Sequence, residues 1–376
     1  MAEEHPIKIK RWLYPAALLY GAGVNLRNKL FDWGVLRSES FDVPVICIGN
    51  IAVGGTGKTP HTEYLIRLLQ KENNVAVLSR GYKRKTKGYQ LATEDSTVRM
   101  IGDEPLQIKK KFPGIHVAVD KNRRHGIKKI CQLTNPEVEV ILLDDAFQHR
   151  YVQTGINILL TDYNRLFCDD ALLPAGLLRE STHARYRAQI VIVTKCPPDI
   201  KPIEFNILAK RLHLYPYQEL YFSTLRYGRL TPVCADKETS GMELSDISKD
   251  QPVLLVTGIA SPFTMIEEIK KYTEKVETLS FSDHHNFSNK DIQYIQERFY
   301  KIEGDDKILI TTEKDAERLR EHPRLSDELK QRLFVLPIEI EFLQNQQNTF
   351  NQHIIGYVRK NKRNSILSSG KDANKP

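Results

Sequence analysis

The chain has 376 residues, 41% hydrophobic and 27% charged, and exceeds the roughly 250 to 300 residues that one hydrophobic core usually organises, so we expect two domains. Its five scattered cysteines contain no CxxC pair, which argues against a disulfide framework or a zinc site and fits a reducing compartment. The net charge of +8 indicates an anionic partner, and nucleotide, nucleic acid and anionic membrane would all qualify.

The first notable element is the uncharged stretch from Trp12 to Leu26, which has basic residues on both sides. It is shorter than the roughly 18 to 20 apolar residues that a membrane-spanning helix needs. It can be a cleaved signal peptide, a helix buried in the core, or an anchor that lies on a membrane surface. Aromatic residues and basic flanks favour the surface anchor. Pro15, Gly21 and Gly23 disfavour a single long helix through this stretch.

Short β-branched runs alternate with helical patterns through the first half of the chain, which predicts βαβ units and a mostly parallel sheet. The runs are apolar throughout, as expected for strands that are covered on both faces. The expected strands are Val43–Gly49, Val75–Ser79, His116–Asp120, Val140–Asp145, Asn157–Asp162 and Gln189–Lys195. A basic helix and linker, Lys201–Pro216, follows them.

A second series of elements after this linker predicts a smaller α/β domain. Its expected strands are Leu220–Tyr227, Pro252–Ile259, Val276–Phe281, Lys307–Thr312 and Leu333–Ile340, with helices over Phe263–Tyr272 and Lys290–Ile302. The end of the chain, Arg359–Pro376, is basic and rich in Ser, Asn and Lys, which predicts a frayed tail.

The run VICIGNIAVGGTGKTP, Val45–Pro60, combines an apolar strand, a glycine-rich turn and the start of a helix, the pattern of a P-loop. Its glycines let successive backbone amides point at phosphate oxygens, Lys58 neutralises the β and γ phosphates, and the Thr59 hydroxyl can ligate Mg²⁺. Ala52 replaces the first glycine of the general pattern, which is tolerated where the backbone is not left-handed. The residues expected to bind nucleotide are Ala52, Val53, Gly54, Gly55, Thr56, Gly57, Lys58 and Thr59.

Two adjacent carboxylates, Asp144 and Asp145, follow the buried strand pattern Val138–Leu143. Acids at the carboxyl end of a strand beside a phosphate loop are placed to hold Mg²⁺ together with Thr59. The alternative is a solvated turn without a metal. The following His149 in DDAFQHR disfavours this alternative. The sequence therefore predicts a magnesium site here.

The nucleotide is expected to be ATP. Guanine-specific P-loop proteins read the base with an Asn/Thr-Lys-x-Asp run. Thr194–Pro197 has proline where the aspartate should stand, and Thr312–Asp315 has the wrong spacing. ATP is therefore favoured over GTP.

Several further clusters follow in order: SRGYKRK (Ser79–Lys85), GDEP (Gly102–Pro105), DKNRRHG (Asp120–Gly126), LLPAGLLRE (Leu172–Glu180), FSDHHNF (Phe281–Phe287) and TEKDA (Thr312–Ala316). Each alone is explained by a solvated basic loop or a polar turn. Together with the phosphate loop and DDAFQH, their order and spacing from Val43 to Ala316 resemble the lipid A 4'-kinase family, the tetraacyldisaccharide 4'-kinases.

The resemblance implies an α/β fold in which a three-layer α/β/α P-loop domain faces a second, smaller α/β domain across a cleft that holds the active site, with a thin two-stranded hinge. It implies transfer of the γ-phosphoryl group of ATP, with Mg²⁺, to the 4' hydroxyl of a tetraacylated glucosamine disaccharide 1-phosphate. We expect a membrane-surface segment (1–35), a P-loop domain (36–215), a second domain with the hinge strands (216–342), and a C-terminal helix with a basic tail (343–376). The chain would work peripherally at the cytoplasmic face of a Gram-negative inner membrane.

The resemblance also implies roles for single residues. Asp103 of GDEP matches the general base, and His284 matches the histidine that pairs with it when the domains close. Arg123 matches a cation for the transferred or acceptor phosphate. Glu180 is expected to act behind the metal ligands, and His149 belongs to the element behind the metal site.

Other functions stay open from the sequence. The chain can be a P-loop kinase for another lipid or sugar hydroxyl, or a nucleotide-switched, membrane-associated binding protein in which Asp103 has no chemical role. A nucleic-acid translocase is disfavoured, because no basic groove with interleaved aromatic residues is evident. The oligomeric state and the acyl chains of the acceptor cannot be read from the sequence.

Overall fold

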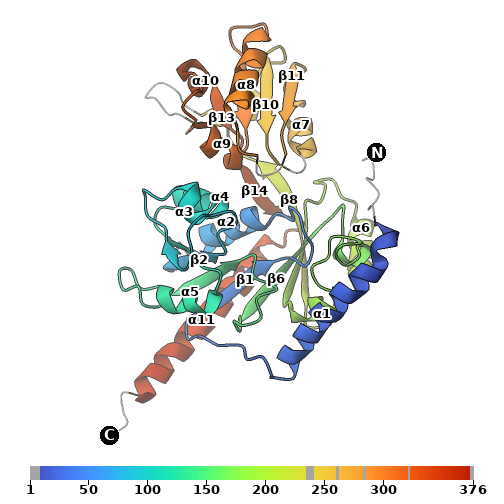
Figure 1. Ribbon diagram of the computed structural model, residues 1–376, viewed down its shortest axis with the longest axis vertical. Helices are drawn as coiled ribbons and strands as arrows, with labels where there is room; N and C mark the ends of the chain where they lie inside the picture. The colour runs from blue at the N-terminus through green and yellow to red at the C-terminus, as the bar shows by residue number, and fades with distance from the viewer. Residues whose placement is uncertain (1–8, 234–240, 260–261, 283–284, 321, 373–376) are drawn as a thin grey trace. The chain divides into compact units, whose positions relative to one another are not determined.

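The computed structural model describes residues 9–233, 241–259, 262–282, 285–320 and 322–372. The chain forms two compact units, one of Met1–Leu225 with Ile340–Pro376 and the other of Arg226–Glu339. Each unit has its own sheet with helices around it (Figure 1). The α/β class expected from the sequence is confirmed.

The larger unit is built on a nine-stranded sheet in the order β14-β8-β7-β6-β1-β5-β2-β4-β3. The strands from β8 to β4 run parallel, and β3 pairs antiparallel with β4. The six strands predicted in the first half of the chain are confirmed to within two residues at each end. The strands are β1 (Val45–Gly49), β2 (Val75–Ser79), β3 (Gln90–Leu91), β4 (His116–Val119), β5 (Val140–Asp144), β6 (Ile156–Asp162), β7 (Ile190–Thr194), β8 (Glu219–Tyr227) and β14 (Ile338–Phe342).

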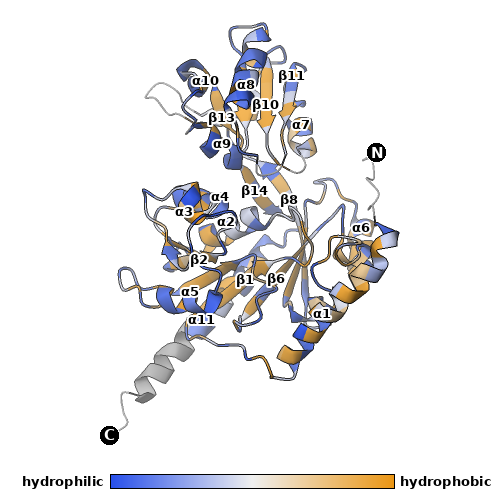
Figure 2. Cartoon of the chain, viewed as in Figure 1, coloured by the Kyte–Doolittle hydropathy of each residue, from blue (hydrophilic) through white to orange (hydrophobic). Residues whose placement is uncertain are grey.

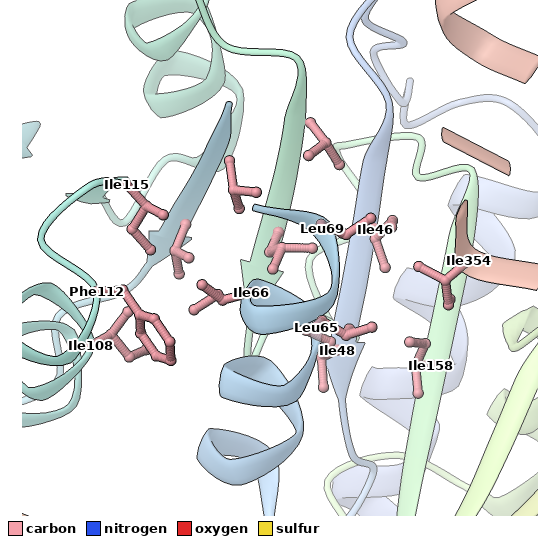
Figure 3. Packing of buried hydrophobic residues seen from close by; sticks show 14 of the residues in the cluster. Ile46, Ile48, Leu65, Ile66, Leu69, Ile108, Phe112, Ile115, Ile158 and Ile354 are labelled. Atoms are coloured by element: carbon pink, nitrogen blue, oxygen red, sulfur yellow. The ribbon is translucent and has the colours of Figure 1, made fainter. Parts of the chain in front are cut away.

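Helices cover both faces of this sheet, as its uniformly apolar strands require. One apolar core contains side chains of α2 (Lys58–Leu69), α4 (Asp103–Lys111) and α11 (Gln347–Asp372). Figure 3 shows Leu65 and Leu69 of α2 beside Ile46 and Ile48 of β1 in this core. The core on the other face includes α5 (Arg123–Ile130) and α6 (Pro202–Leu212), which completes three layers. The short helices of this unit are η1 (Arg11–Leu13), α3 (Val98–Ile101), η2 (Phe167–Asp169) and η3 (Thr182–Arg187).

The smaller unit repeats the architecture around five strands in the order β11-β10-β12-β13-β9, parallel except for β9. Two apolar cores lie on the two faces of the sheet. The predicted strand Leu333–Ile340 is in fact two strands, β13 and β14, because Pro337 interrupts it. The elements are β9 (Thr231–Pro232), η4 (Leu244–Asp246), β10 (Val253–Thr257), α7 (Phe263–Ile269), β11 (Val276–Ser280), α8 (Asn289–Lys301), β12 (Ile308–Thr311), α9 (Glu313–Arg320), α10 (Asp327–Gln331) and β13 (Leu333–Val335).

Near the amino terminus the chain forms one helix, α1 (Tyr14–Asp32), although Pro15, Gly21 and Gly23 were expected to disfavour a single long helix. Pro15 lies in the first turn, where a missing amide hydrogen costs nothing. A Cβ at Gly21 would lie 2.7 Å from Leu172 Cδ1, so glycine lets the helix lie close to this side chain. Among the residues that the structure describes, no helix is both long and apolar enough to cross a membrane.

Helix α1 lies on the surface with most of its large apolar side chains exposed. Trp12 in η1, Leu19 and Leu26 in α1, and Trp33 directly after α1 repeat every seven residues and are 56% to 78% exposed. A seven-residue spacing keeps side chains on one side of a helix, and Figure 2 shows the hydrophobic positions along α1. The buried residues of the helix are Ala17, Gly21 and Phe31. This exposure does not fit a helix buried in the core.

At the other end of the chain, α11 continues as a helix to Asp372. Its first half is fixed in the core by Phe350, Ile354 and Val358. Tyr64 Oη donates to Asn351 Oδ1 at 2.7 Å and adds a polar contact with α2. The frayed tail expected from Arg359 is therefore helical in its described part.

Candidate nucleotide and phosphoryl-transfer site

The phosphate loop leaves the central strand β1 and enters α2, as the motif predicts. Gly57 stands before the first residue of α2 with φ of 80°, a left-handed conformation that favours glycine. Asn50 Nδ2 donates to Thr56 Oγ1 at 2.8 Å across the loop. The buried Thr194 Oγ1 donates to Thr56 O at 3.0 Å. These bonds fix the loop before any phosphate binds.

The segment Leu172–Glu180 pairs with the entry of the loop. Val53 N donates to Leu177 O at 2.8 Å, and Arg179 N donates to Ile51 O at 2.7 Å. Ala52 and Leu178 form an antiparallel bridge between these two bonds. Ala52 therefore lies in extended backbone, where its methyl group is tolerated.

Asp145 sits among cations at the end of β5. Lys58 Nζ lies 3.7 Å from Asp145 Oδ1, and Arg179 Nη1 lies 3.2 Å from both carboxylate oxygens. Burial raises the pKa of Asp145, but Lys58 and Arg179 outweigh burial and hold it below its ordinary value. Asp145 is thus ionised, and the loop lysine is held beside it. Arg179 belongs, with Glu180, to the LLPAGLLRE motif recognised in the sequence.

Asp144, the last residue of β5, is in the opposite electrostatic situation. It is 2% exposed, and burial together with Glu104 and Asp145 raises its pKa to about 7. Lys58 lowers it by less. The carboxylate accepts one long hydrogen bond, from Thr62 Oγ1 at 3.4 Å. A buried carboxylate with so little compensation is suited to a cation.

The influence of Glu104 on Asp144 indicates that the GDEP segment lies near the two aspartates at the end of β5. Asp103 and Glu104 are the first two residues of α4, whose first turn therefore faces this edge of the sheet. Negative charge in a first turn is favoured by the helix dipole. Sequence reasoning missed Glu104, although its place directly after Asp103 was the available signal.

Arg123 is buried beside the acids at the start of α5. Its Nη1 donates to Asp120 O at 2.6 Å, and its Nη2 lies 3.5 Å from Asp144 O. Burial lowers the pKa of Arg123, and Asp144 and Asp145 oppose that effect. The side chain is 3% exposed, and its Nε has no hydrogen-bond partner in this described part of the chain.

Glu180 is buried and paired with Arg187, so its direct partner is a cation of the protein. The Arg187 guanidinium lies 4.5 Å from the ring centroid of Phe147. Phe147 follows Asp145 and Ala146 in the DDAFQH turn. Glu180 is thus connected, through Arg187 and the ring of Phe147, to the turn that carries Asp144 and Asp145. The sequence did not indicate Arg187.

His149 and Gln148 continue from this turn. Gln148 Nε2 donates to Asn50 O at 2.7 Å, which ties the turn to the phosphate loop. Burial, with the nearby Arg123 and other arginines, lowers the pKa of His149 to about 4, so its ring is neutral at physiological pH. A surface pocket of about 300 Å³ is lined by Lys121, Asn122, Arg124, His149 and Tyr151.

The expected residues therefore differ in how the structure places them. Lys58, Asp144, Asp145 and Arg123 lie at one edge of the sheet, and their neighbours in the loop and in α4 surround them. Thr59 follows Lys58 in the first turn of α2. His284 lies outside the described residues. In that part of the chain which is described, no three His, Cys, Asp or Glu side chains gather as a metal cluster.

Comparison with known proteins gives a consistent result. The family model LpxK, described as tetraacyldisaccharide-1-P 4'-kinase, matches residues 9–358. A tetraacyldisaccharide 4'-kinase of Bacteroides thetaiotaomicron is 62% identical over 99% of both chains. One from Flavobacterium johnsoniae is 44% identical over 94% of this chain and 98% of its own. The crystal structure of Aquifex aeolicus LpxK in complex with ATP matches with a TM-score of 0.70, 26% identity, and coverage of 93% and 99%.

Proposed function

The chain belongs to the tetraacyldisaccharide-1-P 4'-kinase family, and we propose that the edge of its larger sheet is the ATP site of such a kinase. The chain transfers the γ-phosphoryl group of ATP to the 4' hydroxyl of a tetraacylated glucosamine disaccharide 1-phosphate, a lipid A precursor. The observation that carries this conclusion is the family match across residues 9–358, which spans every motif of the site. The ATP in the Aquifex aeolicus structure supports the choice of phosphoryl donor.

On the donor side, the loop amides and Lys58 bind the phosphates of ATP. Lys58 is already held 3.7 Å from Asp145, so its ammonium group needs little reorganisation when the phosphates arrive. Arg179 is a second cation at the same carboxylate, at 3.2 Å. Phosphoryl transfer depends mainly on positioning and on neutralising phosphate charge, and this edge provides both.

The residues fit Mg²⁺. Asp144 is weakly hydrogen-bonded, and its pKa of about 7 reflects first its burial and then its negative neighbours Glu104 and Asp145, whose charge a divalent cation would neutralise. We propose that Asp144, Asp145 and Thr59 hold Mg²⁺ with phosphate oxygens of ATP. The bound ion would neutralise charge that develops on those oxygens.

On the acceptor side, we propose Asp103 as the base that takes the proton of the attacking hydroxyl. Its place in the first turn of α4, next to Glu104, brings it toward the metal acids. The proposed role of His284 rests on the family resemblance.

The basic pocket beside His149 is a suitable place for an anionic group of the acceptor. Lys121 and Arg124 line it together with the neutral ring of His149. It adjoins α1 through Arg27, whose Nη2 donates to Gln148 O at 3.1 Å. A phosphorylated sugar held here would leave its acyl chains near the apolar side of α1.

We propose that α1 binds the membrane surface at the cytoplasmic face, where ATP is available. Its exposed stripe of Trp12, Leu19, Leu26 and Trp33 has the apolar area for interfacial binding, and Arg11 and Lys29 suit anionic lipid. Leu19→Glu should weaken flotation with anionic vesicles more than it lowers ATP hydrolysis. Tyr294→Glu, an exposed site on the smaller unit, serves as the control. Equal binding by both variants would contradict the anchor.

The activity is tested with purified full-length chain, γ-labelled ATP, Mg²⁺ and a tetraacylated glucosamine disaccharide 1-phosphate. We expect one labelled lipid, with phosphate at the 4' position by NMR. Label at another hydroxyl would instead support the alternative of a kinase with a different acceptor position. ATP hydrolysis without labelled lipid would support the nucleotide-switched binding protein.

A further inference from the structure

A buried histidine of α2 contacts the phosphate loop and has no part in the proposed mechanism. His61 is 3% exposed, and its Nδ1 lies 2.7 Å from Gly57 O. Its Nε2 lies 3.0 Å from the Oγ of Ser223, a residue of β8. The imidazole ring therefore bridges a carbonyl of the loop and a strand of the larger sheet.

The two partners determine which ring nitrogen carries the proton. A carbonyl oxygen only accepts hydrogen bonds, so Nδ1 of His61 donates to Gly57 O. Both partners are uncharged groups and the ring is buried, which favours the neutral imidazole. Its Nε2 then accepts a hydrogen bond from the Ser223 hydroxyl. These two buried hydrogen bonds fix the direction of the Gly57 carbonyl.

A second buried side chain holds the preceding carbonyl of the loop. Thr194, the last residue of β7, is fully buried, and its Oγ1 donates to Thr56 O at 3.0 Å. A Cβ added to Gly57 would lie 3.5 Å from His61 Nδ1 and 3.9 Å from Thr194 Cβ, so both side chains lie against this glycine. Two successive carbonyls of the loop are thus hydrogen-bonded to buried side chains.

The direction of a carbonyl also determines the direction of the next amide. In a planar trans peptide, the C=O and the following N–H point in opposite directions. The bonds to Thr56 O and Gly57 O therefore direct the amides of Gly57 and Lys58 away from the buried side chains that hold these carbonyls. Lys58 begins α2, and amides at the start of a helix are suited to bind an anion.

A glycine-rich loop needs such bonds because its peptide planes can rotate. Gly54 has a φ of 122° and Gly57 a φ of 80°, and glycine adopts these and other conformations at similar cost. We propose that His61 and Thr194 are positioning residues that hold the Gly57 and Lys58 amides toward the phosphates of ATP. Both act through the backbone of the loop. This inference rests on the proposed function for the identity of the anion, and a role in packing alone is the alternative.

The first test removes the Thr194 hydroxyl without a large change of shape. Thr194→Val should lower the affinity for ATP and for inorganic tripolyphosphate by the same factor, about ten-fold, because the free energy that orients the peptide must then come from binding. Thr194→Ser keeps a hydroxyl and should bind both ligands like wild type. The matched control is Thr311→Val in the smaller sheet, where Thr311 Oγ1 donates to Val256 O at 2.8 Å. It should lose stability and keep both affinities.

The second test separates the two hydrogen bonds of His61. His61→Asn places an amide donor near the position of Nδ1 and should keep the bond to Gly57 O. His61→Gln extends its amide toward Ser223 in place of Nε2 and leaves Gly57 O without this donor. The affinity for ATP should therefore be about ten-fold lower in His61→Gln than in His61→Asn. If these variants do not fold, the Thr194 variants decide.

Calorimetry measures these affinities without phosphoryl transfer, so a failure to phosphorylate the lipid would appear only in the transfer assay. Wild-type affinity of Thr194→Val for both ligands overturns the proposal. A loss of ATP affinity without a loss of tripolyphosphate affinity also overturns it, because the effect would then concern the nucleoside. Equal ATP affinities of His61→Asn and His61→Gln would assign His61 to packing alone.

Discussion

Two buried aspartates near the carboxyl ends of parallel strands, one in each unit, have opposite surroundings. Asp315 of the smaller unit follows β12 and is fully buried. Its Oδ2 accepts from Gly258 N and Thr312 Oγ1, each at 2.7 Å, and Arg318 Nη1 lies 3.6 Å from its Oδ1. The protein itself therefore compensates the charge of this carboxylate.

Asp144 of the larger unit is also buried, but within the described part of the chain its carboxylate accepts a single long hydrogen bond, of 3.4 Å from Thr62. Glu104 and Asp145 are its negative neighbours, which Lys58 and Arg123 offset only in part. A compensated buried acid stabilises the fold, whereas an uncompensated one destabilises it unless a cation binds. Burial alone thus does not separate a structural acid from a functional one. The partners of the carboxylate do.

The largest effect should come from Asp103, the proposed base. Asp103→Ala should lower turnover by ~100-fold or more, because the attacking hydroxyl loses its proton acceptor, and leave ATP affinity nearly intact. Steady-state kinetics with lipid and calorimetry with ATP measure the two quantities. Asp95→Ala, an exposed acid of the same unit, is the control. Unchanged turnover in Asp103→Ala would reject its role as base.

The compensated acid should affect stability instead. Asp315→Ala leaves the Gly258 amide and the Thr312 hydroxyl without their acceptor and should lower the free energy of unfolding of the smaller unit by about 2 kcal/mol or more. Asp144→Asn removes a charge that is poorly compensated and should not destabilise the larger unit. Urea unfolding of both variants makes the comparison. If Asp144→Asn were the more destabilised protein, the distinction between the two acids would be wrong.

A smaller effect is expected from pH. The pKa of Asp144 is raised to about 7 in the folded protein from an ordinary value of 3.8, so the folded state binds the extra proton between these values. Stability without metal should therefore fall as pH rises from about 4 to 7, by at most about 1.4 kcal/mol per pH unit from this group. The difference between wild type and Asp144→Asn isolates it. A difference that does not change with pH would contradict the raised pKa.

Much of the fold was predictable because local patterns determine it. The apolar strands around β1 and the loop that ends at Lys58 carry their signals within a few residues. The acids at the end of β5 could be located in the same way. The continuity of α1 was missed because the helix packs against residues far away in the sequence, such as Leu172 beside Gly21.

The partners of the site residues were not predictable. Glu180 was expected behind the metal, but its pairing with Arg187 depends on how η3 is placed. His61 and Ser223 are far apart in the sequence, and only the fold brings them together. Single-motif reasoning identifies the residues that carry the chemistry, and tertiary structure decides which charges they meet.

The most direct test of the central claim is the stabilisation that Mg²⁺ with a non-hydrolysable ATP analogue gives at pH 8. The shift in Tm should be large for wild type, unchanged for Asp315→Asn, and close to that of the analogue without metal for Asp144→Asn. Such a result would show that the Asp144 carboxylate is needed to bind Mg²⁺. A full magnesium-dependent shift in Asp144→Asn would contradict the account.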